Sequence, residues 1–123
     1  MKTQNNIVRL IGNLGHAPEV REVAPGRKVA RMSVATNESY TNSSGERVTD
    51  TQWHTVVAWG RMAEMVQRLL AKGSSVVVEG RLLHRSFAGK DGLKRHVTEI
   101  VMGDLKVLAS GKRQQSDEER AAA

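Results

Sequence analysis

The chain has 123 residues, which is enough for one domain with a modest hydrophobic core and too few for a second, catalytic domain. It has no cysteine, which excludes disulfides and thiol catalysis and removes the commonest zinc ligand. The formal net charge is +6, and the whole excess lies in residues 1–111 because cations and acids balance beyond them. This excess favours a polyanion such as nucleic acid or an anionic membrane surface, although a solvated basic surface kept for solubility explains it equally well.

The chain has the composition of a folded domain, with 39% hydrophobic and 26% charged residues. No apolar run is long enough to span a membrane, and residues 1–10 lack the apolar stretch of a secretory signal. The sequence therefore predicts a cytoplasmic protein.

Alternating apolar residues and turn signals predict about five long strands and a short extended piece. In chain order these segments are residues 6–12, 19–23 (the short piece), 29–37, 51–59, 74–85 and 95–109. Residues 39–50 are predicted to be a polar loop that Gly45 closes as a hairpin, and residues 87–94 a second, glycine-bearing hairpin. We expect the last strand to break near Gly103.

The period becomes helical after Gly60, and Lys72 followed by Gly73 is a helix stop. The predicted buried face of this helix consists of Met62, Val66, Leu69 and Leu70. The pattern predicts an all-β fold with a small α insertion: a five-stranded Greek-key barrel of the OB type, with the helix between the third and fourth long strands. OB folds bind oligonucleotides. We expect the barrel to span residues 1–110 and a short flexible tail to span residues 111–123.

Only four residues of the chain carry aromatic rings: Tyr40, Trp53, Trp59 and Phe87. Trp53 and Trp59 are an even number of residues apart, so they share a face of a regular strand. A tryptophan on a strand is usually a core residue, and each of the two taken singly fits that interpretation better. Tyr40 and Phe87, however, lie in polar segments near predicted hairpins. We also expect arginines beside three of the rings: Arg47 near Tyr40, Arg61 near Trp59 and Arg85 near Phe87. Rings beside cations are what non-specific binding of single strands needs, so we predict that all four rings are exposed for base stacking.

Five segments together resemble the bacterial single-stranded DNA-binding protein (SSB) family over about residues 5–108. They are "NNIVRLIGNLGHAPEVR", "VARMSVATNESY", "TQWHTVVAWGRMAE", "LLAKGSSVVVEGRL" and "GLKRHVTEIV". The resemblance implies an OB-fold subunit of a homotetramer that binds single-stranded DNA without reading its sequence, in replication, recombination and repair at the nucleoid. It needs no cofactor.

The resemblance also assigns residues. Bases are expected to stack on Tyr40, Trp53, Trp59 and Phe87, and phosphates to contact Arg61, Lys72 and Arg85. Thr55, Leu83 and Ser86 stand where some members of the family carry a cation. His54 is expected at a subunit interface.

The segment 6–12, with Ile7 and Arg9, is apolar and β-branched, and we expect it to form an edge that pairs with another subunit, because an unpaired edge is a liability. A dimer fits the sequence as well as the tetramer that the resemblance implies.

Family members usually end in an acidic tip closed by an apolar aromatic residue, which recruits repair and replication enzymes. Here the sequence ends "SDEERAAA", with no terminal phenylalanine. Residues 117–119 are either a remnant of that tip or, as we favour, a solvated helix end. The resemblance therefore does not extend to recruitment of replication and repair proteins by this tail.

Catalysis and metal binding are not predicted. The four histidines have no ligand spacing with one another, and no paired carboxylates or nucleophile with its base occur at a usable spacing. One non-enzymatic alternative stays open: an OB-fold replication-restart accessory that acts mainly as a protein-interaction module, with its rings as interface hot spots.

Overall fold

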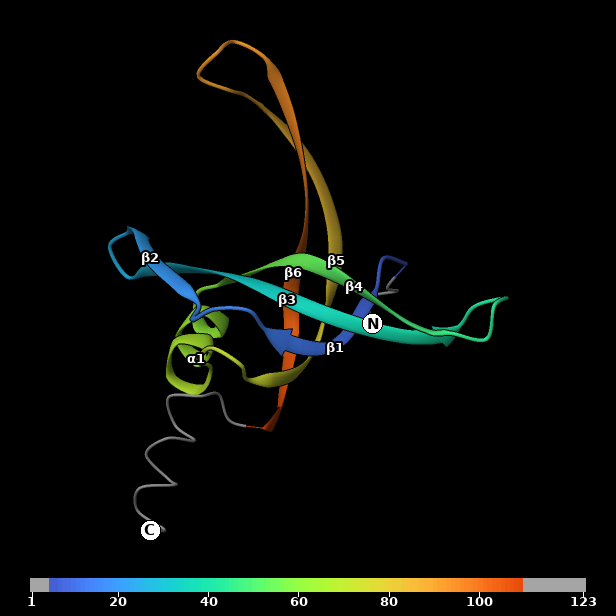
Figure 1. Ribbon diagram of the computed structural model, residues 1–123. Helices are drawn as coiled ribbons and strands as arrows, with labels where there is room; N and C mark the ends of the chain where they lie inside the picture. Colours follow the sequence, from blue (N-terminus) through green and yellow to red (C-terminus); the bar gives the residue numbers. More distant parts are fainter. Residues whose placement is uncertain (1–4, 110–123) are drawn as a thin grey trace, which may run out of the picture.

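The computed structural model describes residues 5–109, which form six strands and one helix (Figure 1). The elements are β1 (Val8–Leu14), β2 (Glu19–Ala24), β3 (Arg27–Thr41), β4 (Arg47–Trp59), α1 (Arg61–Leu69), β5 (Ser75–Ala88) and β6 (Lys94–Ala109). The strand order is β1-β5-β6-β4-β3-β2, and a further pairing of β1 with β3 closes five of the strands into a barrel. β2 extends the sheet from β3. The predicted OB-type barrel, with its helix between the third and fourth long strands, is confirmed.

The hairpin of β3 and β4 is longer than the sequence indicated. Its regular antiparallel register runs from Val29 opposite Trp59 to Thr41 opposite Arg47, so only residues 42–46 form the loop. The prediction of a polar loop over residues 39–50 was therefore wrong at both ends. The side-chain oxygen Oδ1 of Asn42 accepts hydrogen bonds from the backbone N–H groups of Ser44 and Glu46, and this closes the turn.

The hairpin of β5 and β6 projects from the barrel in another direction (Figure 1). Its loop is closed in a similar way, because Oδ1 of Asp91 accepts a hydrogen bond from the Leu93 N–H group. Nearer the barrel, Glu79 pairs with Asp104 and Gly80 with Met102, which leaves Gly103 as the extra residue of a β-bulge. The break expected near Gly103 is thus confirmed as a bulge within a continuous strand.

Helix α1 lies at one end of the barrel (Figure 1) and buries Ala63 and Val66 against it. The helix ends at Leu69, three residues before Lys72, because Leu70 adopts an extended conformation. This change of conformation turns Leu70 into the core and leaves Leu69 39% exposed. The placement of Leu69 on the buried face was therefore wrong, whereas that of Val66 and Leu70 is confirmed.

The core is aliphatic. Its largest fully buried hydrophobic side chains are those of Val34, Val56, Val66, Val76 and Val78. Alanine, leucine, isoleucine and methionine complete it, and none of the four aromatic residues belongs to it. Filling the barrel with small aliphatic groups leaves the rings for other surfaces.

Gly12 lies where β1 approaches β3, and a Cβ atom there would overlap the backbone carbonyl of Ala35. Because that carbonyl belongs to a paired strand and cannot move freely, we expect Gly12→Ala to lower the free energy of unfolding by about 1–3 kcal/mol. Urea unfolding measures this change.

Gly103→Ala is the matched control, because the nearest atom to its added Cβ would be the Glu79 carbonyl oxygen at 3.8 Å. We expect it to change the free energy of unfolding by less than about 0.5 kcal/mol. Equal stability of the two variants would show that barrel closure does not require a glycine at position 12.

Candidate nucleic-acid interface

The four aromatic rings are exposed. Their exposed fractions are 55% for Tyr40, 60% for Trp53, 44% for Trp59 and 43% for Phe87. The interpretation of the tryptophans as core residues is therefore wrong, and the prediction that all four rings are held in solvent is confirmed. Exposing this much aromatic surface has a hydrophobic cost that a partner can recover.

Trp53 and Trp59 lie on one face of the β3–β4 pair, as the even spacing predicted. The register has no irregularity between them: Trp53 lies opposite Ala35 and Trp59 opposite Val29. The Trp53 ring also rests on Gly15, just after β1, where an added Cβ would lie 2.5 Å from ring atom Cζ3. The indole therefore packs against the backbone of Gly15, and any side chain there would displace the ring.

The cation beside Trp59 is not the one that the sequence suggested. The guanidinium carbon of Arg27, at the start of β3, lies 5.7 Å from the centroid of the Trp59 ring, within cation–π range. Arg61, next but one to Trp59 in sequence, begins α1 and is exposed to solvent. Its expected role as a phosphate contact stays a prediction.

Tyr40 faces the other way. It lies opposite Val48 in the same regular register, five residues from Ala35, so it projects from the opposite face of the ribbon to Trp53. Arg47 lies opposite Thr41, one rung along, and so does not share the face of Tyr40. The hairpin is exposed on both faces here, which leaves Tyr40 accessible but off the surface that the tryptophans share.

Phe87 lies on the second hairpin and shares one face of it with two arginines. Arg95 on β6 is directly opposite it, and Arg85 precedes it by two residues on the same face of β5. Arg95 makes an exposed ion pair with Asp91, with 2.9 Å between Nη2 and Oδ2. The structure therefore brings Phe87 together with Arg85, as predicted, and adds Arg95.

A buried carboxylate holds Arg85. Glu99 on β6 has a side chain only 5% exposed, and its Oε1 accepts a hydrogen bond of 2.9 Å from Nε of Arg85. Its Oε2 accepts bonds of 2.8 Å from Nη1 of Arg31 and 3.3 Å from Nη2 of Arg85. The hydrogen bonds from Arg85, aided by the charges of both arginines, outweigh burial and hold the pKa of Glu99 below its ordinary value, and the same contact raises the pKa of Arg85.

Sequence reasoning missed Arg27, Arg31 and Glu99. Glu99 had a usable signal, since an acid within the apolar run "VTEIVM" needs a buried cationic partner. The identity of the partners required the register of β3 against β4 and of β5 against β6.

The other predicted residues are placed as follows. Lys72 is exposed beyond α1 and lines a groove of about 400 Å³ with Ala17, Pro18 and Gln67. His54 is half-buried, with Nε2 2.9 Å from the Thr36 hydroxyl oxygen. Ile7 and Arg9 are exposed at β1.

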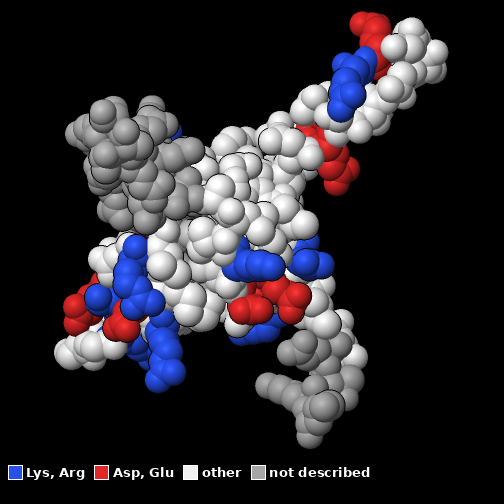
Figure 2. All heavy atoms as spheres, turned by 90° about the horizontal axis from the view of Figure 1, so that it is seen from below, with Lys and Arg blue, Asp and Glu red and all other residues white. Residues whose placement is uncertain are grey.

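On the face that Figure 2 shows, charge alone does not outline a binding surface. The Lys and Arg side chains there form separate groups, with Asp or Glu among them and uncharged atoms between. Among residues 5–109 there is no group of three or more His, Asp or Glu side chains that could hold a metal ion. Nor does that part of the chain contain a helix with the length and hydropathy of a membrane span.

The closed five-stranded barrel with a capping helix places the chain among OB-fold proteins. The model of the single-strand binding protein family matches residues 5–108, so the chain belongs to that family.

The chain is similar to proteins from several organisms. It is 44% identical over 106 residues to single-stranded DNA-binding protein 1 of Chlorobaculum tepidum, a match that covers 85% of this chain and 65% of that protein. It is 42% identical over 103 residues to the single-stranded DNA-binding protein of Neisseria meningitidis, covering 84% of this chain and 59% of that protein. The chain thus spans less than two thirds of either relative.

A solved structure shares the fold. The Plasmodium falciparum SSB in complex with ssDNA has a TM-score of 0.77 and 31% identity, covering 88% of this chain and 98% of that one.

The depressed pKa of Glu99 predicts an acid-labile contribution to stability. A carboxylate whose pKa is lower folded than unfolded stabilises the fold above its ordinary value of 4.5, and the contribution is lost as the pH falls through the folded pKa. We expect Glu99→Gln to lower the free energy of unfolding by about 1–3 kcal/mol at pH 7, because two arginines lose a charged acceptor.

Urea unfolding of the native protein and the variant between about pH 7 and pH 3 measures this difference. It should shrink as the pH falls below 4.5. Curves that stay parallel over the whole range would contradict a stabilising role for the ionised carboxylate.

Proposed function

We propose that this protein binds single-stranded DNA without sequence preference and acts without catalysis, protecting the strand during replication, recombination and repair. Bases stack on Tyr40, Trp53, Trp59 and Phe87, and phosphates contact Arg61, Lys72 and Arg85. The observation that carries the proposal is the division of side chains between an aliphatic core and four exposed rings. Trp59 and Phe87 have arginines beside them, and Trp53 packs against the backbone of Gly15.

Stacking accounts for binding that does not read sequence. Every base has a flat face, and one stacked base contributes about 1–3 kcal/mol by alanine substitution. Cations add a part that salt weakens, because each neutralised phosphate releases counterions. Membership of the single-strand binding family and the likeness to an SSB seen with ssDNA support the same function.

The rival function is an OB-fold module that docks to replication proteins through the same rings. The rings of such a module need no match to bases, and its cations need not follow them. A gel shift with single-stranded and double-stranded oligonucleotides separates the two, because only the DNA-binding function gives a preference for the single strand.

We expect Trp53→Ala and Trp59→Ala each to weaken binding of oligo-dT by about 1–3 kcal/mol, because each removes a stacking platform. This loss should persist at salt concentrations where Arg61→Ala no longer has an effect, since stacking is less screened than a phosphate contact. Quenching of tryptophan fluorescence, titrated at low and high salt, measures both.

Leu69→Ala serves as the control, since Leu69 is an exposed apolar residue on α1 that carries no aromatic ring. Emission of the native protein that stays unchanged at saturating oligo-dT would count against stacking and hence against the proposed function.

We also infer that the chain forms a homo-oligomer, a tetramer or a dimer, through the outer surface and edge of β1. From Val8 to Gly12 this strand pairs only with β5, so its other edge is unpaired within residues 5–109. Ile7 and Ile11 are 54% and 59% exposed there. The other residues expected at the interface are Arg9 and His54. A cytoplasmic, nucleoid-associated location stays a prediction. Residues 111–123 lie outside the described residues, and their role in partner recruitment stays open.

Light scattering tests this inference. We expect a mass that is a multiple of the 13.5 kDa chain, and a lower mass for Ile11→Glu, because a buried charge at an interface is costly. Val23→Glu, a change at another exposed apolar residue on β2, should leave the mass unchanged. A monomer in the native protein would overturn the inference.

A further inference from the structure

Arg31 and Arg85 come from β3 and β5, two strands that do not pair with each other, yet they share one carboxylate. Both oxygens of Glu99 are occupied by arginine N–H groups at 2.8–3.3 Å. The Glu99 side chain is 5% exposed, whereas those of Arg31 and Arg85 are 42% and 48% exposed. The acid is therefore buried beneath two half-exposed cations, and the cluster presents positive charge to solvent.

The guanidinium groups keep donors for a ligand. Arg31 donates to Glu99 only through Nη1, and Arg85 donates through Nε and Nη2. Most N–H groups of the two guanidinium groups are therefore not bonded to protein within residues 5–109. Glu19 lies opposite Arg31 on β2, but the ion pair that Arg31 makes in that part of the chain is with Glu99. Two planar forks fixed side by side suit the oxygens of a phosphate.

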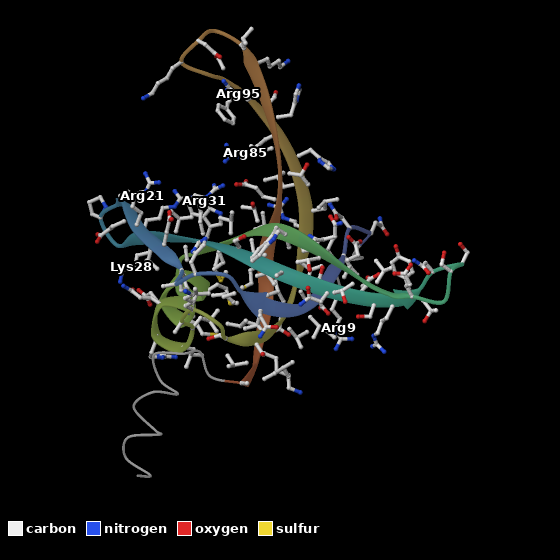
Figure 3. All side chains as sticks on the ribbon, in the orientation of Figure 1. Arg9, Arg21, Lys28, Arg31, Arg85 and Arg95 are labelled. Atoms are coloured by element: carbon white, nitrogen blue, oxygen red, sulfur yellow. The ribbon has the colours of Figure 1, made fainter. Side chains whose placement is uncertain are left out.

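The cluster also lies between the rings. Arg31 is opposite Val57, between the Val29–Trp59 and Ala35–Trp53 rungs, and all three rungs are an even number of residues apart. Arg31 therefore shares the face of the two tryptophans. On the other side, Arg85 shares its face of β5 with Phe87. Figure 3 shows Arg21, Arg31, Arg85 and Arg95 along one side of the molecule, from β2 to the outer part of the β5–β6 hairpin, with Arg9 apart from them.

We propose that Arg31 and Arg85, held together by the buried carboxylate of Glu99, form one site for a backbone phosphate of single-stranded DNA on its path between Trp59 and Phe87. Arg31 is a new phosphate contact, and Glu99 is a positioning residue that does not touch the DNA. This site rests on the proposed function.

The first test compares Arg31→Ala with Arg68→Ala, which removes the same charge from an exposed position in the last turn of α1. Affinity for oligo-dT is measured by tryptophan quenching over a range of salt concentrations. We expect Arg31→Ala to lose about tenfold in affinity at low salt and to reduce the slope of log K against log salt by about 0.7, the value for one phosphate on a single strand. Arg68→Ala should match the native protein in both.

The second test uses Glu99→Gln, which removes a negative charge and keeps the shape of the side chain. General electrostatics predicts tighter binding by the more positive protein. The proposed site predicts weaker binding, by about threefold, because a neutral amide no longer holds two guanidinium groups together. Circular dichroism checks that each variant is folded. If Glu99→Gln does not fold, the result for Arg31→Ala still tests the site.

The outcomes separate the two proposals. If the native protein shows no quenching by oligo-dT, the proposed function is wrong and this site with it. If the native protein binds but Arg31→Ala and Arg68→Ala have equal affinities and salt slopes, this site alone is wrong. Tighter binding by folded Glu99→Gln would likewise exclude the positioning role of Glu99.

Discussion

The short contact between β1 and β3 is the constraint on which the rest of the structure depends. Only two rungs join these strands, Asn13 with Ala35 and Leu14 with Val34, and β1 can approach so closely because Gly12 has no side chain. Closure at this distance leaves an interior that valine, alanine and methionine fill. The same contact builds the surface outside, since Trp53 lies opposite Ala35 and rests on Gly15, one residue beyond the end of β1. Closing the barrel and holding an exposed indole ring in place are thus two results of one arrangement.

The cations around the rings are placed by the fold in different ways. Arg27 lies over the Trp59 ring. Arg85 and Arg95 share the face of Phe87, and each of these two is paired with an acid. For Asp91 the acid is half-exposed, so its pair with Arg95 contributes little to stability. For Glu99 the acid is buried and both its oxygens are used, so the pair of arginines is held at a fixed position. Because the acid is buried, the guanidinium groups of the two arginines are the charges that a phosphate contacts.

The sequence predicted the barrel and its helix because period-two and helical patterns are strong wherever one face of an element is buried. It failed over residues 39–50 because this hairpin is exposed on both faces and so carries no apolar alternation. It also predicted which residues carry exposed rings, from their scarcity and their polar surroundings. It could not show that Tyr40 faces away from Trp53, or that Arg27 rather than Arg61 covers Trp59, because both facts depend on the register of β3 against β4. Glu99 was visible as a charge in an apolar run, but its two partners lie on other strands.

Photocrosslinking of an oligo-dT that carries 5-iodouracil tests most directly whether the exposed rings are platforms for bases, because the halogenated base reacts with an aromatic side chain that it stacks on. Mass spectrometry of the crosslinked peptides then locates the contacts. The account predicts crosslinks at Tyr40, Trp53, Trp59 and Phe87, lost one by one when each ring is replaced by alanine. Crosslinks confined to the outer surface of α1, with these four rings unmodified, would contradict it.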